Sequence, residues 1–153
     1  MLKNILEHFV YRDEVDNFRK KSKIIMVSCL AYLLPALYII YSPLKKYHFL
    51  AFVAFLQVLL SVLSDFVFIE SNERHSKIID VVDRINSIIY TSFILILLIR
   101  NHFVFSIINV LLTTLLIEYS RRSKNQEEWI KRHTLWHFAS SIILLVCLEQ
   151  INN

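Results

Sequence analysis

The run YHFLAFVAFLQVLLSVLSDFVFI, residues 47–69, contains no charged side chain before Asp65. A helix needs about 20 apolar residues to cross the hydrocarbon core of a bilayer, so this run predicts a membrane-spanning helix. The whole chain has 153 residues, of which 56% are hydrophobic, and it contains no glycine. Soluble domains of this length have fewer apolar residues and more turn formers. The composition therefore predicts an integral membrane protein.

Four other runs have the same character, which predicts an all-α, polytopic transmembrane helical bundle of about five spans. Pro35 falls inside the first span and predicts a kink. Residues 1–23 precede the bundle, which occupies residues 24–150, and their apolar side chains recur at helical spacing between charged ones. They predict an N-terminal amphipathic segment in the plane of the membrane surface. The predicted spans cover residues 24–41, 47–69, 78–99, 103–119 and 132–148.

Lysine and arginine are distributed unevenly between the two ends of these spans. One end has thirteen of them and the other has three, while Arg84 lies within a span. Because basic connections stay in the cytoplasm, we expect a cytoplasmic N-terminus and a C-terminus on the opposite side. The net charge of +4 is thus explained by orientation, and we expect no nucleic acid as a partner. The smaller group is Lys45, Lys46 and Arg100, and the larger one is Lys3, Arg12, Arg19, Lys20, Lys21, Lys23, Arg74, Lys77, Arg121, Arg122, Lys124, Lys131 and Arg132.

The absence of glycine also bears on function. A loop that cradles phosphate groups needs glycine to bring backbone N–H groups together, so nucleotide-driven chemistry of that type is excluded. Cys29 and Cys147 both lie inside apolar runs. We interpret them as small hydrophobic side chains rather than as a disulfide or a metal cluster.

Polar residues of the predicted spans gather near the cytoplasmic end. His133 and His137 are four residues apart, so they lie on one face of a helix and can reach a single metal ion. Asp65 lies near the end of the second span and Asp83 lies in the first turns of the third. Both are expected at the same depth as the histidines. Acids inside a membrane usually face the bundle interior and have a partner there. Two imidazoles and a carboxylate are also a ligand set of zinc, which predicts a Zn²⁺ site.

The run HTLWHFAS, residues 133–140, resembles the last-span histidine motif of the CREST superfamily of membrane proteins. That superfamily includes alkaline ceramidases, progestin and adipoQ receptors, and hemolysin III-like proteins. Its pattern has a serine and a histidine four apart late in one span. An aspartate begins the next span, and two histidines four apart lie in the last. In the family the three histidines hold zinc, and the serine and aspartate attend the bound water. The family core has seven spans, against about five predicted here.

Three positions of this chain match the family pattern directly. His133 and His137 match the final histidine pair, and Asp83 matches the aspartate. The resemblance implies that both histidines are zinc ligands. It also implies that Asp83 is the general base that holds the water.

The serine-plus-histidine element has two candidates. Ser61 and Asp65 have the right spacing and depth, but aspartate stands where the family has histidine. Ser71 and His75 have the family's residue types, but they fall in a predicted loop. We favour Asp65 as the third ligand because it reaches the depth of the histidines and carboxylate can replace imidazole on zinc. His75 stays as the alternative ligand, and Ser61 is the predicted hydrogen-bond donor to the developing oxyanion.

Two functions follow from these residues. The first is a zinc-dependent intramembrane hydrolase of a lipid amide or ester, similar to alkaline ceramidases, with a membrane lipid as substrate. The second is a non-catalytic membrane protein that keeps a polar or metal-bound core for structure or for binding a lipid or a partner. The second function is favoured by the missing third histidine, whose place Asp65 takes, and by a number of spans smaller than that of the family.

Overall fold

A computed structural model describes residues 19–71 and 74–152 of the chain, and every element within these ranges is helical. Five helical rods are long and apolar enough to cross a membrane, which confirms the all-α bundle of five spans. The N-terminal segment lies mostly outside the described residues, so the amphipathic helix stays a prediction. The elements are α2 (Lys23–Cys29), η1 (Leu30–Tyr32), α3 (Leu33–Tyr41), η2 (Pro43–Lys46), α4 (His48–Val62), η3 (Leu63–Val67), α5 (Arg74–Ile99), α6 (Phe103–Arg121) and α7 (Gln126–Asn152).

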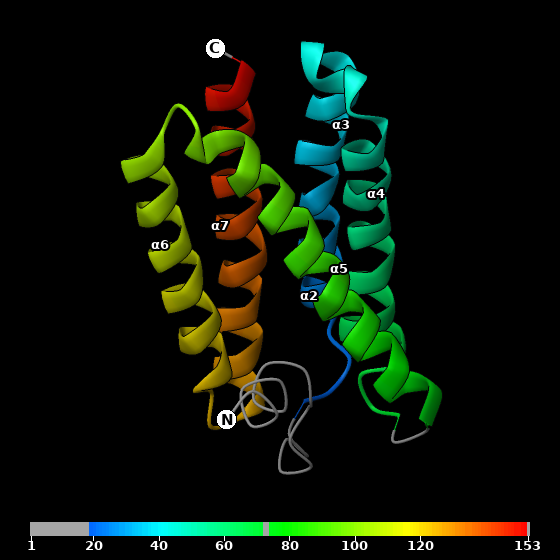
Figure 1. Ribbon diagram of the computed structural model, residues 1–153. Coiled ribbons are helices and arrows are strands. Elements are labelled where there is room, and N and C mark those ends of the chain that lie inside the picture. Colours follow the sequence, from blue (N-terminus) through cyan, green and yellow to red (C-terminus); the bar gives the residue numbers. More distant parts are fainter. Residues whose placement is uncertain (1–18, 72–73, 153) are drawn as a thin grey trace.

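The rods run alternately up and down (Figure 1). The start of α2, the connection from η3 to α5 and the connection from α6 to α7 therefore share one end of the bundle. α7 packs against α2, α3, α5 and α6, while α4 packs against α3 and α5. α5 crosses obliquely in front of α7 in this view. Residues of α7 thus face several other helices at once, which is what a site shared between helices requires.

The first rod changes its winding next to Pro35. Proline has no backbone N–H, so the carbonyl of Ala31, four residues earlier, loses its helical partner. The rod adopts a 3₁₀ turn at Leu30–Tyr32, just before the proline. The Ala31 carbonyl instead accepts a hydrogen bond from Ser141 Oγ on α7, at 2.6 Å. The break in the first helix therefore also attaches α7 to it.

Two helices begin earlier than the hydrophobic pattern predicts. α7 starts at Gln126 instead of residue 132, and α5 starts at Arg74 instead of residue 78. Asn125 Oδ1 accepts a hydrogen bond from the Glu128 N–H at 2.9 Å, which caps α7. Acidic side chains in the first turn also complement the helix dipole. Charged residues outside the apolar span therefore extend the helix, and the connection between α6 and α7 is short.

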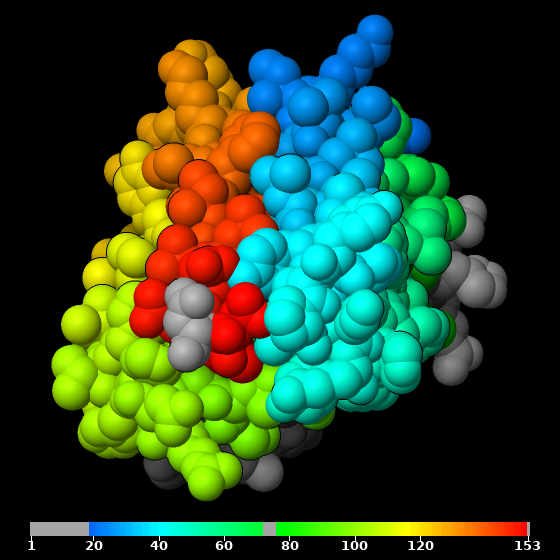
Figure 2. Space-filling view, turned by 90° about the horizontal axis from the view of Figure 1, so that it is seen from above, coloured from blue at the N-terminus to red at the C-terminus, as the bar shows by residue number. Residues whose placement is uncertain are grey.

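The hydrophobic core occupies the end of the bundle opposite the polar residues. Its largest cluster joins α3, α4, α5 and α7 through side chains such as Ile39, Leu50, Ile94 and Leu148. Seen from this end (Figure 2), the last turns of α7 lie against the segment that follows α3. A smaller cluster of Ile25, Cys29, Ile69 and Trp129 packs the other end. Burial is thus divided between two clusters, with polar side chains between them.

Candidate functional site

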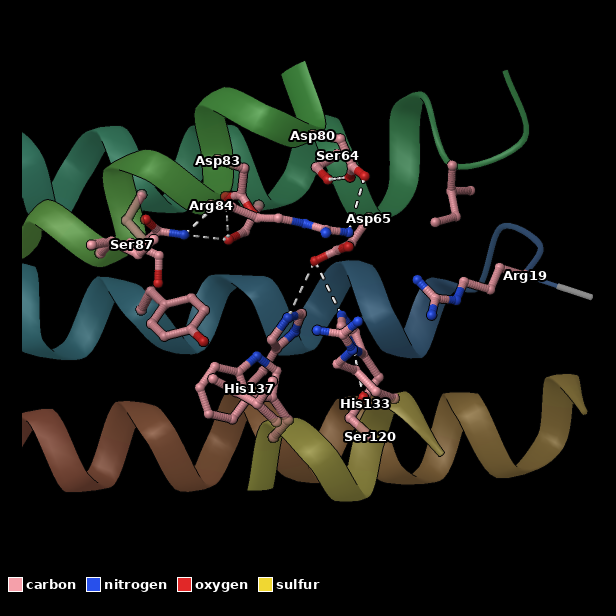
Figure 3. Close-up of a pocket in the computed structure, with 18 of the residues that line it drawn as sticks. Arg19, Ser64, Asp65, Asp80, Asp83, Arg84, Ser87, Ser120, His133 and His137 are labelled. Atoms are coloured by element: carbon pink, nitrogen blue, oxygen red, sulfur yellow. Dashed lines mark hydrogen bonds and ion pairs between the residues drawn. The ribbon is translucent and has the colours of Figure 1, made fainter. Parts of the chain in front are cut away.

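The second span ends in a π-helical segment, Leu63–Val67, which carries Asp65. The Phe68 N–H bonds to the Leu63 carbonyl, five residues earlier, at 2.9 Å, and this wider turn is typical of functional sites. Asp65 Oδ2 lies 3.2 Å from His133 Nε2 and 3.3 Å from His137 Nε2. Figure 3 shows a dashed line from the carboxylate to each of the two rings. The structure therefore brings together the three residues that the sequence analysis favoured as metal ligands.

A serine from another helix holds the far nitrogen of each histidine. Ser28 Oγ on α2 lies 2.8 Å from His137 Nδ1, and Ser120 Oγ on α6 lies 2.9 Å from His133 Nδ1. The His137 side chain is buried, and its ring contacts the His133 ring with centroids 4.5 Å apart. With Nδ1 occupied, each ring presents Nε2 to Asp65. Partners of this kind fix the ring orientation of metal-binding histidines.

The tautomer of His137 depends on the direction of its hydrogen bond with Ser28. Ser28 Oγ lies 2.7 Å from the Ile25 carbonyl and 2.8 Å from His137 Nδ1, so it can donate its single proton to either of them. If it donates to Ile25, Nδ1 carries the single proton of a neutral imidazole, and Nε2 presents a lone pair to the Asp65 carboxylate. Two lone pairs at this distance repel each other. That tautomer therefore requires a cation between His137 and Asp65 or a second proton on the ring, whereas in the other tautomer Ser28 donates to Nδ1 and Nε2–H of a neutral ring can donate to Asp65.

The separations between these atoms fit a bound metal ion. Zinc lies about 2.0–2.2 Å from nitrogen and oxygen ligands, which places two tetrahedral ligand atoms about 3.3–3.6 Å apart. The distances of 3.2 and 3.3 Å from Asp65 to the two histidines are close to this range. His133 Nε2 is buried, and among the described residues it makes no hydrogen bond, although Asp65 Oδ2 lies 3.2 Å away. A buried nitrogen of this kind suits coordination better than proton sharing.

Cys29 also lies close to this cluster, which the sequence analysis did not anticipate. Ligand atoms of Cys29, Asp65 and His137 all lie within 4.8 Å of one another. However, Cys29 Sγ is 3.7 Å from Nδ1 of His137, which is the nitrogen turned away from Asp65. The thiol also donates to the Ser61 carbonyl at 3.6 Å. We therefore favour His133 over Cys29 as the third donor, with Cys29 as a packing neighbour.

A second cluster surrounds Asp83 at the start of α5. Asp83 Oδ1 accepts hydrogen bonds from Ser61 Oγ at 3.1 Å and from Gln57 Nε2 at 2.9 Å. Asn86 Nδ2 donates to Gln57 Oε1 at 2.8 Å and so fixes the orientation of the Gln57 amide. Both hydrogen bonds are accepted by the same carboxylate oxygen, Oδ1. In this arrangement Ser61 positions Asp83, and it must turn away from Asp83 before it donates to any other oxygen.

The neighbouring acid has a different set of partners. Asp80 accepts a hydrogen bond from Ser64 and forms an ion pair with Arg84, with 3.2 Å between the charged atoms. Arg84 and Asp80 are four residues apart on α5, a spacing that favours such pairs. The Arg84 cation therefore balances Asp80, while the carboxylate of Asp83 is held by neutral groups.

Both clusters line one cavity of about 430 Å³. Its walls come from α4, α5, α6 and α7, and Figure 3 shows the labelled side chains around it. Arg19 and Arg121 also line this cavity. The Asp65–histidine cluster and the Asp83 cluster therefore face the same space, in which a substrate group could contact both.

His75 lies in the first turn of α5 and not in the predicted loop. Its side chain is outside the described part of the structure, so its role as an alternative ligand stays a prediction. Ser71, the serine four residues earlier, accepts a hydrogen bond at its carbonyl from Ser76 Oγ at 2.8 Å. Asp65 contacts both histidines and is therefore the better supported third donor.

Several residues of the site were missed by the sequence analysis. Gln57 is a polar residue in the middle of an apolar run. Because burying a polar side chain in a membrane costs free energy, its position alone could have marked it as a candidate site residue. Asn86, a polar residue within the third predicted span, was also missed. Ser28 and Ser120 gave no signal, because serine is common in membrane helices and its partner depends on helix packing.

Comparison with known proteins identifies no relative: no family model, curated protein or solved structure matches the chain. The geometry supplies a carboxylate between two histidines and a second, hydrogen-bonded carboxylate, both facing one cavity.

Proposed function

We propose that the chain is a zinc-dependent hydrolase that cleaves an amide or ester bond of a membrane lipid. The observation that carries the proposal is the shared cavity, which faces both a metal-type donor set and the Asp83 carboxylate. Metal hydrolases need this combination, because the ligands hold the ion and a separate base handles the proton of the water. The resemblance of the histidine run to alkaline ceramidases supports the same chemistry.

His133, His137 and Asp65 are the residues that would hold zinc in this protein. When bound, zinc polarises a carbonyl and lowers the pKa of a coordinated water to about 7. Ser28 and Ser120 keep the two imidazole rings in the orientation that presents Nε2 to the cavity. With zinc bound, the two positive charges of the ion and the one negative charge of Asp65 would leave the site with a net charge of +1. Such a site favours negative charge on a substrate oxygen.

Asp83 is the proposed general base. Its Oδ1 atom is held by Ser61 and Gln57, so its other oxygen can accept a proton from the attacking water. The same carboxyl group can then return the proton to the leaving amine or alcohol. Ser61, once it rotates from Asp83, is placed to donate to the oxyanion that forms on the substrate carbonyl.

The proposed orientation places this site in the cytoplasmic half of the membrane. The excess of lysine and arginine at this end of the bundle supports that orientation. A site at membrane depth suits a substrate that stays in the bilayer, because the lipid keeps its chains in hydrocarbon while its polar group enters the cavity.

A hydrolysis assay tests the proposal directly. Purified protein in lipid nanodiscs should release fatty acid from at least one class of N-acyl or O-acyl lipid, and a zinc chelator should stop the release. Re-addition of zinc should restore it, since the ligands remain in place. A protein that holds zinc but releases no fatty acid from any lipid amide or ester would contradict the hydrolase.

One observation favours the second function, a non-catalytic membrane protein with a polar core. A neutral His137 can satisfy both Ser28 and Asp65 without any metal, with Nδ1 accepting from Ser28 and Nε2–H donating to Asp65. In that state the contacts of Asp65 with the two histidines would fix η3 against α7. The two functions are distinguished by Asp83, which matters for turnover only in the first.

Replacing Ser28 with alanine should weaken zinc binding by about 10- to 100-fold, the usual effect of losing a residue that orients a metal ligand. The ring of His137 would then rotate more freely, while all three ligands remain. Zinc affinity is measured by competition with a chelating dye. Ser141→Ala is the matched control, because Ser141 is equally buried but bonds only a backbone carbonyl. Equal losses in the two variants would argue against orientation by Ser28.

A further inference from the structure

The end of α6 is bound by a side chain of α7, next to the histidine site. The last carbonyls of a helix have no partner within the helix and need one elsewhere. Arg132 Nη1 on α7 donates to the Arg122 carbonyl at 3.1 Å and to the Tyr119 carbonyl at 3.4 Å, both in the last turn of α6. Basic side chains commonly bind such carbonyls. Arg132 therefore attaches the last turn of α6 to α7.

The Arg132 guanidinium is itself held by two further contacts. Its Nη2 atom lies 3.2 Å from Glu128 Oε2, one turn earlier on α7, and its side chain is 23% exposed. Its central carbon lies over the Tyr119 ring, 4.6 Å from the ring centre. A planar guanidinium can donate in several directions and stack on a ring at the same time, whereas a lysine ammonium is a compact point charge. Lysine at this position would therefore keep the charge and lose most of these contacts.

Ser120 lies in the same turn of α6, between the two residues whose carbonyls Arg132 binds. Ser120 Oγ is 2.9 Å from His133 Nδ1, as the dashed line in Figure 3 shows, and Ser120 is buried. His133 directly follows Arg132 on α7. Arg132 thus holds the backbone on both sides of Ser120, while Ser120 holds the neighbouring histidine. A shift of this turn would move the hydroxyl away from the ring.

We propose that Arg132 is a positioning residue of the histidine site. By fixing the end of α6 it keeps Ser120 on Nδ1 of His133, and Nε2 of the same ring then faces Asp65, 3.2 Å away. Loss of a partner that orients a metal-binding histidine typically lowers metal affinity by about 10- to 100-fold. The inference rests on the proposed function for the role of His133 as a zinc ligand. It extends the site to a residue that touches neither the ligand atoms nor the cavity.

A double-mutant cycle on zinc affinity tests this inference, with Arg132→Lys, Ser120→Ala and the two combined. Each single variant should weaken zinc binding by about tenfold or more, measured by competition with a chelating dye. Because Arg132 acts through Ser120, adding Arg132→Lys to Ser120→Ala should cause no further loss. A residue that only stabilised the fold would lower affinity, if at all, equally in both backgrounds. The combined variant separates positioning from stability.

Arg122→Lys is the matched control, since the Arg122 side chain is 79% exposed and pairs with Glu118 on its own helix. It should bind zinc like the native chain. Unchanged affinity in Arg132→Lys, a further loss on adding it to Ser120→Ala, or an equal loss in Arg122→Lys would each overturn the inference.

Nitrogen-15 NMR of the zinc-free chain, labelled at histidine, tests the same contact without the ion. The His133 signals are identified by their absence in His133→Ala. The Nδ1 shift should move in the same direction in Ser120→Ala and Arg132→Lys, because both weaken its hydrogen bond, and should stay in place in Arg122→Lys. A chain that shows these shifts but binds no zinc rejects the proposed function alone. A chain that binds zinc and is unaffected by Arg132→Lys in both measurements rejects this inference alone.

Discussion

Asp83→Asn should abolish lipid turnover while the protein keeps its zinc. Asparagine has the shape of aspartate and can still accept hydrogen bonds from Ser61 and Gln57 through its amide oxygen. It cannot accept the proton of the attacking water, and loss of a general base lowers rates by about 10²- to 10⁴-fold. We expect a fall of this size in kcat/KM, measured by release of labelled fatty acid, with unchanged zinc per chain.

Asp80→Asn is the matched control for this change. Asp80 lies one turn away on α5, lines the same cavity and also carries a carboxylate, but it is bound to Ser64 and Arg84. Its loss removes an ion pair and should leave kcat/KM within a few-fold of the native value. Full activity in Asp83→Asn would show that Asp83 is not the general base. An equal fall of kcat/KM in both variants would point to a general effect of charge or folding instead.

The double variant His133→Ala/His137→Ala should bind no stoichiometric zinc. It leaves Asp65 as the one remaining donor of the set, and a single carboxylate does not hold the ion against water. We expect zinc affinity to fall by more than the 100-fold or so that loss of an orienting residue produces. Zinc per chain is measured by inductively coupled plasma mass spectrometry after dialysis against a weak chelator.

His102→Ala is the control for the double variant, because His102 precedes α6 at the opposite end of the bundle. It should keep the zinc of the native chain. Helix content by circular dichroism and a single peak on size-exclusion chromatography separate loss of the ion from loss of the fold. Unchanged zinc in a folded double variant would place the ion elsewhere in the protein.

Much of the fold could be predicted because a bilayer imposes length and hydropathy on every span. The predicted span at residues 103–119 agrees with α6, which ends at Arg121. The prediction was wrong at Gln126, where a charged stretch assigned to a connection belongs to α7. Hydropathy distinguishes segments inside the membrane from segments in water. It does not distinguish a helix from a loop among the segments in water.

The candidate site could be predicted in part. Helical spacing places His133 and His137 on one face, and depth in the membrane favoured Asp65 as their partner. The π turn at Asp65 could not be predicted, because it depends on how the end of α4 packs. The serines that hold the two rings are contributed by helices far apart in the sequence, and spacing carries no information about such contacts.

X-ray absorption at the zinc edge is the measurement that tests the central claim most directly, namely that Asp65 and the two histidines hold one ion. Zinc-loaded native protein should show two imidazole nitrogens and carboxylate oxygen at about 2.0–2.2 Å. His133→Ala/His137→Ala, treated in the same way, should retain no zinc and therefore show no zinc edge. A protein that takes up no zinc, or a spectrum with a sulfur ligand at about 2.3 Å from Cys29, would contradict the proposed site.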